Sequence, residues 1–157
     1  MGNVQDNQIV LFQIDNQEYG IRINMVEGIN QLKDFAITKL PNTEGYIEGI
    51  INLRGNVIPL YNLRKKFGFD ETEIDKESEI LVVSSKNLKI GFIVDIVTDI
   101  IRLEQEKIHP ASKLFNQVGD EYIEGIGQYE NKMLVVLNTE KILTLEERKD
   151  IEPLVED

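Results

Sequence analysis

Short stretches in which apolar and polar residues alternate recur along this chain, and most of them occur twice. Residues 9–12, a polar turn and residues 19–26 are matched by residues 80–83, a polar turn and residues 90–97. Alternation with a period of two is the pattern of a strand that buries one face. In the second copy Ile93 adds an apolar residue between the alternating ones, which predicts a strand covered on both faces. The pattern therefore predicts a duplicated unit rich in β-strands.

A second pair of matching segments follows in each copy. Residues 46–50, Tyr-Ile-Glu-Gly-Ile, reappear unchanged as residues 122–126. Each segment begins a predicted hairpin, with its turn at residues 55–56 in the first copy and at residues 131–132 in the second. Gly55 can adopt the positive φ that a two-residue turn demands.

The two copies also define the domain organisation that we expect. Matching positions are 71 residues apart near the start of the copies (20 and 91) and 76 apart near their end (46 and 122), so the second copy has a longer connection. The copies cover about residues 9–68 and 80–143, and the acidic stretch 69–79 between them reads as a linker. We expect a single domain over residues 9–150. The pattern leaves open whether strands are exchanged between its two subdomains.

Two short helices are expected beside these strands. Asn62 resembles a helix N-cap before residues 63–67, and Gly68 closes that helix at its C-terminal end. Thr144 begins a capping-box pattern for a C-terminal helix that ends near Val155. Most of the chain is nevertheless strand at the regular spacing that is typical of small barrels and sandwiches.

The composition fits a soluble globular protein and excludes several kinds of partner. Of 157 residues, 41% are hydrophobic and 29% are charged, and the net charge is −11. Such an acidic chain is unsuited to nucleic acids and to anionic membrane surfaces, because both are bound through basic side chains. No apolar stretch approaches the ~18 residues that span a bilayer, and the absence of cysteine excludes disulfides and thiolate metal sites. We therefore expect a cytoplasmic protein that binds no nucleic acid.

Few residues are suited to catalysis or metal binding. His109 is the only histidine and precedes a proline, without evident partners for a general base or a metal site. The acidic stretch 70–79 resembles a calcium loop, but Asp75 occupies the sixth position, where such a loop needs glycine. Glu48 and Glu124 recur because the repeat recurs, which favours a structural role. We expect no catalytic residue, metal or cofactor; a small hydrolase that uses Glu48 or Glu124 is the alternative from the enzyme class.

The copies differ in charge at the hairpin tip. Residues 52–55 read Asn-Leu-Arg-Gly and residues 128–131 read Gln-Tyr-Glu-Asn, so Arg54 in one copy faces Glu130 in the other. The shared fold does not require this reversal. Either both tips are ordinary polar turns, or Arg54 faces a partner, where its planar donor fork suits a carboxylate. The basic residues within 63–67 have the same two interpretations, a partner contact or a cap at a helix C-terminus.

Residues 49–60, Gly-Ile-Ile-Asn-Leu-Arg-Gly-Asn-Val-Ile-Pro-Leu, resemble the CheW family of chemotaxis coupling proteins. The pattern of that family is a glycine, apolar residues, Asn-Leu-Arg-Gly and an apolar strand that contains proline. Further matches follow the family's order and spacing at residues 18–21, 94–97, 108–110, 122–125 and 133–138. The resemblance runs from about Ile9 to Leu145, which is nearly the whole chain.

The resemblance implies a mainly β fold with two SH3-like five-stranded β-barrel subdomains, short helices and a C-terminal helix. It also implies a non-enzymatic adaptor that couples methyl-accepting chemoreceptors to the histidine kinase CheA, whose regulatory domain has the same fold. Receptor tips, which are helical hairpins, would lie in a groove between the subdomains, and the kinase would contact the subdomain ends. Such a protein would reach the membrane only through receptors.

Carried over residue by residue, the resemblance implies two groups of residues that bind receptor or kinase. These residues are Asn52, Leu53, Arg54, Gly55 and Val57 in the first group, and Val97, Asp99 and Ile100 in the second. One departure from the family stands out, because Gly28 occupies the place of the glutamate in its V-x-E-I pattern. Glu27 lies one position away and is predicted to point to the opposite face of an extended strand.

Two related functions remain open at this point. One is a CheW-like coupling protein of a chemosensory pathway that does not serve motility. The other is the coupling module of a larger receptor-modifying protein that also carries a phosphoacceptor domain. The chain ends soon after the predicted C-terminal helix, which we take as evidence against the second.

Overall fold

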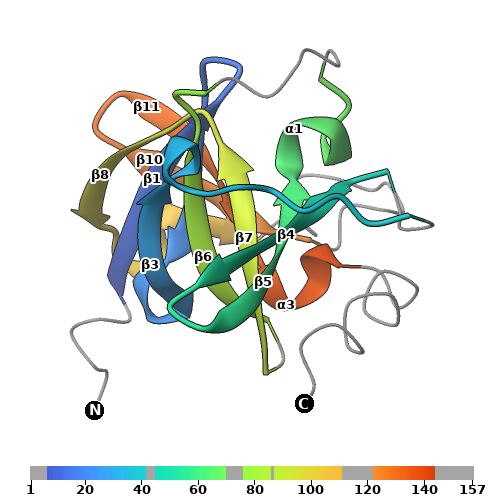
Figure 1. Ribbon diagram of the computed structural model, residues 1–157. Coiled ribbons are helices and arrows are strands. Elements are labelled where there is room, and N and C mark those ends of the chain that lie inside the picture. The colour runs from blue at the N-terminus through green and yellow to red at the C-terminus, as the bar shows by residue number, and fades with distance from the viewer. Residues whose placement is uncertain (1–6, 42–44, 70–75, 86, 111–121, 144–157) are drawn as a thin grey trace.

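The computed structural model describes residues 7–41, 45–69, 76–85, 87–110 and 122–143, and these form two β-sheets with two short α-helices (Figure 1). In spatial order, the strands of the first sheet are β8 (Ile96–Arg102), β1 (Gln8–Ile14), β2 (Gln17–Arg22), β11 (Lys132–Leu137), β10 (Ile123–Tyr129) and β9 (Ile108–Pro110). Those of the second sheet are β3 (Val26–Gln31), β6 (Glu79–Ser85), β7 (Leu88–Val94), β5 (Asn56–Asn62) and β4 (Ile47–Leu53). The helices are α1 (Leu63–Lys66) and α3 (Thr139–Ile142).

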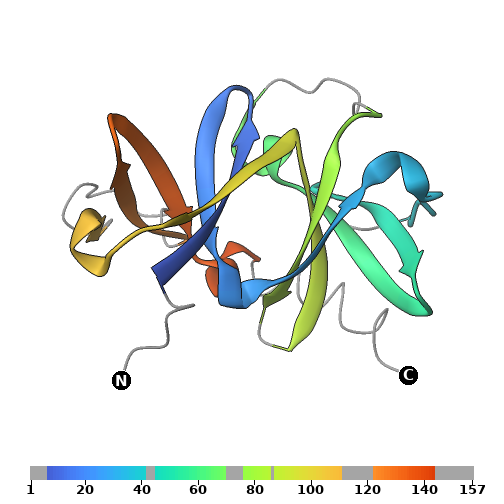
Figure 2. The same cartoon turned by 90° about the vertical axis from the view of Figure 1, so that its left-hand side faces the viewer.

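The predicted fold class is confirmed, since each sheet forms a small SH3-like barrel. We call the sheet that contains β1 the first barrel and the sheet that contains β3 the second barrel. The first barrel has five strands plus the three-residue strand β9, which extends it beyond the expected number. Figure 2 shows the two barrels side by side, with the orange strands β10 and β11 at one side and the teal strands β4 and β5 at the other.

Each barrel contains strands from both sequence copies. In the first barrel, the hairpin β1–β2 of the first copy lies between β8 and β11 of the second copy. In the second barrel, the hairpin β6–β7 of the second copy lies between β3 and β5 of the first copy. The chain therefore crosses between barrels after β2 and again after β7. A sequence copy therefore does not fold into a barrel of its own. The first hairpin of each copy belongs to one barrel, and the remaining strands of that copy belong to the other.

These crossings interrupt two stretches that were predicted as continuous strands. Residues 19–26 break at the 3-10 helix Ile23–Met25, and residues 90–97 break at Asp95, where the chain leaves the second barrel. The prediction was wrong at these boundaries because the alternation continues through them. Ile23, Met25 and Val97 still pack against the cluster of buried side chains between the barrels.

The edge strands β3 and β8 occupy equivalent positions in the two barrels. A register shift interrupts both pairings at the same point, so that Gly28 lies opposite Val82 on β6 and Asp99 lies opposite Leu11 on β1. Residues 71 positions apart, such as Gly28 and Asp99, are therefore equivalent in space. Every residue of these edges thus has a counterpart in the other barrel.

The structure explains why the repeated Tyr-Ile-Glu-Gly-Ile segment contains a glycine in both copies. A Cβ atom on Gly49 would lie 2.3 Å from the carbonyl oxygen of Thr38, and one on Gly125 would lie 2.4 Å from that of His109. Thr38 and Ile50 exchange two backbone hydrogen bonds of 2.9 Å, while β9 pairs with β10 at the equivalent place. Glycine is needed because a neighbouring backbone passes directly over this position.

The largest cluster of buried side chains lies between the barrels and joins them. It includes Phe12 from the first barrel and Phe92 from the second, neither of which is exposed. A separate cluster around Leu134 fills the first barrel, and one around Ile58 fills the second. Burying one such side chain contributes about 1.5–3 kcal/mol, so the central cluster holds the two barrels together as one body.

The predicted helix after β5 is confirmed. The Oδ1 atom of Asn62 accepts a hydrogen bond from the backbone N–H of Lys65 at 3.2 Å, and Gly68 follows the helix with a φ of +79°. Most of the acidic linker and the predicted helix from Thr144 to Val155 lie outside the described residues.

Candidate protein-binding surface

The hairpin between β4 and β5 ends in a two-residue turn formed by Arg54 and Gly55. Their φ angles are +52° and +87°, and positive values at both central positions are what a type I′ turn requires. The backbone N–H of Gly55 donates to Oδ1 of Asn52 at 2.8 Å. The turn is thus held without using the side chain of Arg54.

The equivalent turn between β10 and β11 places Glu130, with a φ of +54°, where the first hairpin has Arg54. The turns predicted at residues 55–56 and 131–132 were therefore one residue too late, because a charged residue and not glycine takes the first central position. Since the first central position of this turn holds arginine in one barrel and glutamate in the other, the fold does not fix the charge there.

Most of the predicted residues on the first hairpin are accessible. Asn52, Arg54, Gly55 and Val57 are exposed, and Leu53 is half-buried. Arg54 forms no ion pair with any other residue that the structure describes. A charged side chain on a rigid, exposed turn is suited to contact with another protein.

Val97, Asp99 and Ile100 lie on β8 in the first barrel, whereas the hairpin of Arg54 belongs to the second barrel. Val97 is half-buried against the central cluster, and its backbone N–H donates to Oε1 of Glu79 at 2.7 Å. Asp99 is exposed, and Ile100 is 48% exposed. The two groups of predicted residues therefore occupy different barrels.

Three accessible apolar residues were missed in the sequence: Ile96, which is 48% exposed, and two counterparts of predicted residues. Ile29 on β3 is the counterpart of Ile100 and is 43% exposed, and Met133 on β11 is the counterpart of Val57 and is 59% exposed. The offsets of 71 and 76 residues between the copies relate both pairs, so the repeat carried the signal that could have found them. Each barrel presents apolar side chains at the same two places.

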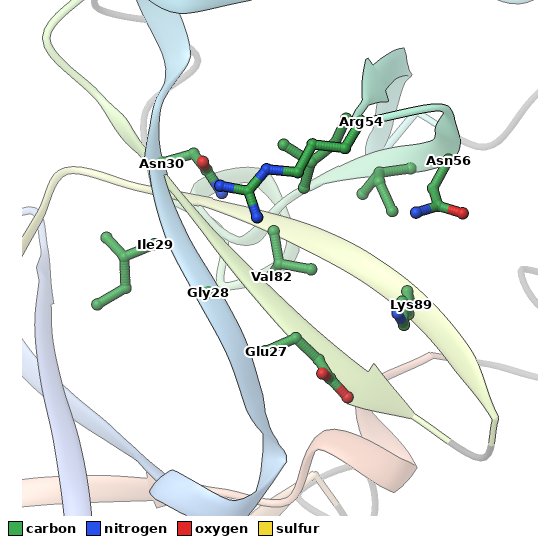
Figure 3. A pocket seen from close by; sticks show the side chains of 10 residues that line it. Glu27, Gly28, Ile29, Asn30, Arg54, Asn56, Val82 and Lys89 are labelled. Atoms are coloured by element: carbon green, nitrogen blue, oxygen red, sulfur yellow. The ribbon is translucent and has the colours of Figure 1, made fainter.

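A groove of about 320 Å³ opens in the second barrel between β3 and the tip of the β4–β5 hairpin (Figure 3). Figure 3 shows the guanidinium of Arg54 extending across this groove towards Asn30, with Lys89 farther along it. Gly28 lies in the wall opposite Arg54, so the departure from the family pattern adjoins the motif arginine. Glu27 lines the same groove, and its predicted placement on the other face was wrong because a bulge interrupts the strand there.

The two motif carboxylates are bound within the protein. Glu48 accepts hydrogen bonds from Nζ of Lys65 at 2.8 Å and from Nδ2 of Asn62 at 3.0 Å. Glu124 accepts two hydrogen bonds from the guanidinium of Arg22. Both carboxylates thus serve as structural anchors, which explains why they recur with the repeat.

The basic side chains of α1 also turn towards the protein. Arg64 donates to Asp15 at 2.9 Å and to Asp95 at 3.1 Å, and so links α1 to the tip of the β1–β2 hairpin. The ammonium of Lys66 lies 5.2 Å from the centre of the Tyr46 ring, within range of a cation–π contact. Of the two interpretations of this basic cluster, these contacts favour the structural one.

Within residues 7–41, 45–69, 76–85, 87–110 and 122–143, no group of three acidic or histidine side chains is arranged to hold a metal ion. His109, the single histidine, is exposed on β9. None of the helices described there has the length and apolar character to cross a membrane.

Comparison with known proteins gives one family over nearly the whole chain. The family model of the CheW-like domain matches residues 8–147. Chemotaxis protein CheW of Klebsiella aerogenes is 32% identical over 146 residues, which cover 93% of this chain and 87% of that protein. Chemotaxis protein CheW of Helicobacter pylori is 35% identical over 144 residues, covering 88% of this chain and 85% of that one.

A solved structure agrees with these sequence relatives. The crystal structure of the scaffolding protein TtCheW from Thermoanaerobacter tengcongensis superimposes with a TM-score of 0.80 at 33% sequence identity, and the match covers 90% of this chain and 95% of that one. The recognition of the family from its motifs is therefore confirmed.

Proposed function

The chain belongs to the family of CheW-like domains, and we propose that it is a non-enzymatic adaptor in the cytoplasm that couples chemoreceptors to the histidine kinase CheA. The family match over residues 8–147 is the observation that carries this proposal. Relatives of comparable length are named chemotaxis proteins, and the structural relative is named a scaffolding protein.

The distribution of polar groups supports binding over catalysis. Glu48 and Glu124, which were the candidates for a hydrolase, already hold structural ion pairs. By contrast, Arg54 and the apolar residues Ile29 and Ile100 are exposed. Accessible apolar and cationic groups of this kind gain free energy when a second protein covers them.

The two barrels offer an adaptor two distinct faces. The Arg54 hairpin lies on the second barrel, and Asp99 with Ile100 lies on the edge of the first. Since the central cluster joins the barrels, partners bound on both faces are held in a defined relative position. Weak contacts of each kind gain strength when many receptors and kinases assemble together.

A receptor tip can be accommodated by the helix-in-groove mode of recognition. An amphipathic helix presents apolar side chains at positions i, i+3, i+4 and i+7. Ile100 and the half-buried Val97 are accessible apolar groups on one edge strand. They are suited to receive such a stripe, and the coupling of kinase to receptor then requires no chemistry in the adaptor.

The proposal is tested by kinase activity in reconstituted membranes. Receptor, CheA and this protein are combined in all pairs and all together, and phosphorylation of CheA is measured. We expect stimulation only when all three components are present. Stimulation that is the same with and without this protein would refute the proposal.

Replacing Arg54 sharpens that test. We expect Arg54→Glu to lower the stimulation at a given protein concentration, with affinity for a partner reduced roughly tenfold to a hundredfold because a charge-assisted contact is lost. Folding should be unaffected, since Glu130 occupies the same turn position in the other barrel. Lys107→Glu is the matched control, because Lys107 is exposed and forms no described ion pair. Equal activity of the two variants would show that Arg54 makes no essential contact.

A further inference from the structure

We propose that the groove of the second barrel receives an acidic side chain of a partner protein, whose carboxylate is bound by Arg54 and Lys89. The inference rests on the proposed function, because it concerns how the adaptor recognises one of its two protein partners. It adds the groove in which the contact is made and a second recognition residue, Lys89, which no motif of the sequence singled out.

The first argument is the presence of uncompensated cations in an acidic protein. The net charge of the chain is −11, and the basic residues Arg64 and Lys65 are neutralised by carboxylates of the protein itself. Arg54 and Lys89 line one groove, and neither forms an ion pair with another described residue. Two cations and one carboxylate, Glu27, therefore line this hollow, and its net positive charge favours an anion.

The second argument is the space left open opposite Arg54. A Cβ atom on Gly28 would find its nearest neighbour, Nδ2 of Asn30, at 3.8 Å, so the glycine is not required by packing. It leaves room in the wall of the groove. The turn fixes the backbone of Arg54 through the 2.8 Å hydrogen bond from Gly55 to Asn52. Because the backbone is already fixed, the entropy lost when Arg54 binds a carboxylate is limited to that of its side chain.

The third argument is the comparison with the first barrel. The offsets of the repeat relate Arg54 to Glu130 and Lys89 to Glu18, so both cations are replaced by acids at the equivalent positions. Glu18 lies 3.5 Å from Nζ of Lys132, within its own barrel. Because the same fold accepts either a positive or a negative charge at these positions, the fold does not require the two cations of the second barrel. We attribute them to the binding of a partner.

The difference extends to the wall of the groove. Asn30 in the second barrel corresponds to Ile101 in the first, where the side chain is only 4% exposed and belongs to the core of the barrel. At this position the second barrel has a polar amide facing the groove (Figure 3). An amide N–H next to Arg54 adds a further donor for a carboxylate oxygen.

The groove favours a carboxylate on a protein over a polyanion. Glu27 also lines it, and the negative charge of the whole chain repels nucleic acid or clustered phosphates. Val82 and Ile58 provide apolar surface at the floor of the groove. A glutamate or aspartate side chain matches both features, since its methylene groups can cover the apolar floor while its carboxylate reaches the cations.

Binding to two purified partners tests the inference. The probes are the cytoplasmic fragment of a receptor and the regulatory domain of CheA, each titrated calorimetrically into the full chain. We expect Arg54→Glu and Lys89→Glu each to weaken binding of one of these partners roughly tenfold to a hundredfold. Lys107→Glu, which changes the net charge equally, should bind as the unaltered protein does. The milder variants Arg54→Gln and Lys89→Gln guard against a loss of folding and should reduce the salt dependence of binding.

Charge exchange identifies the acidic residue itself. Exposed aspartates and glutamates of the affected partner are replaced one at a time by lysine, and one of these variants should regain affinity for Arg54→Glu. Failure of every such variant to do so would overturn the inference. If both groove variants bind both partners as tightly as Lys107→Glu does, the inference falls and the adaptor function stands. If the unaltered chain binds neither partner, both fall together.

Discussion

Replacing the glycine of the repeated Tyr-Ile-Glu-Gly-Ile segment should destabilise both barrels for the same reason. In Gly49→Ala the new methyl group would lie 2.3 Å from the carbonyl oxygen of Thr38, and in Gly125→Ala it would lie 2.4 Å from that of His109. Both obstacles are backbone atoms, so no side-chain rotation removes the clash. The segment that contains Thr38 must instead move away from β4, and β9 must move away from β10.

The cost of that movement follows from the contacts it breaks. Thr38 and Ile50 exchange two backbone hydrogen bonds of 2.9 Å, and each such bond contributes about 0.5–1.5 kcal/mol. Inserting a methyl group into a packed site costs about 1–3 kcal/mol. For Gly49→Ala we therefore expect a loss of about 2–6 kcal/mol in the free energy of unfolding. The φ of +151° at Gly49 places this variant towards the upper end, because alanine is strained there.

Urea unfolding followed by circular dichroism measures these losses. Gly45→Ala is the matched control, since Gly45 is exposed and a Cβ there meets no atom within 4 Å. Its stability should stay within about 0.5 kcal/mol of the unaltered protein. If Gly49→Ala or Gly125→Ala unfolds at the same urea concentration as the control, the close approach of the edge segments is not what selects glycine in this motif.

Two further predictions concern the junction between the barrels and its pH dependence. Arg64→Met removes the ion pairs with Asp15 and Asp95, so stability in urea should fall by about 0.5–1.5 kcal/mol at low salt and by less at high salt, since these groups are partly exposed; a loss independent of salt would contradict this account. Burial raises the pKa of Tyr19 above 10.0, and Tyr122 and Asp15 raise it further. The folded state therefore retains the phenolic proton longer than the unfolded chain, and stability is lost as the pH rises above the unfolded pKa of about 10 and through the folded one. Tyr19→Phe should lose less stability than the unaltered protein between about pH 9 and pH 11, and equal losses would refute the assignment.

The local elements of this fold could be predicted because their causes are local. Asn62 and Gly68 delimit α1 with side-chain and backbone preferences that act within one turn of helix. The crossing at Ile23–Met25 could not be predicted in the same way. Its apolar residues keep the alternation of a strand because they face the core that the two barrels share, so the pattern does not reveal that the strand has changed sheets.

The groove shows the same limit for the candidate site. Gly28 and Arg54 were noted in the sequence as separate features, and Lys89 was not noted at all. They belong to β3, to the tip of the β4–β5 hairpin and to β7, and β3 and β4 are the opposite edges of their sheet. Only the curvature of the sheet brings these edges around one hollow. This curvature arises from the twist of all five strands together, so it cannot be predicted from the sequence of any single segment.

The exchange of strands constrains how this adaptor can transmit a signal. Each barrel needs a hairpin from one copy and an edge strand from the other, so neither barrel can form or separate without both copies. The central cluster and the two crossings of the chain then connect the Arg54 hairpin rigidly to the Ile100 edge strand. Separating the barrels would expose that cluster, at a cost of about 1.5–3 kcal/mol for each side chain that is uncovered. Under the proposed function, a receptor that changes conformation at one face would act on the kinase by repositioning the adaptor as a whole, and the contacts at its two faces, not its interior, would determine the strength of coupling.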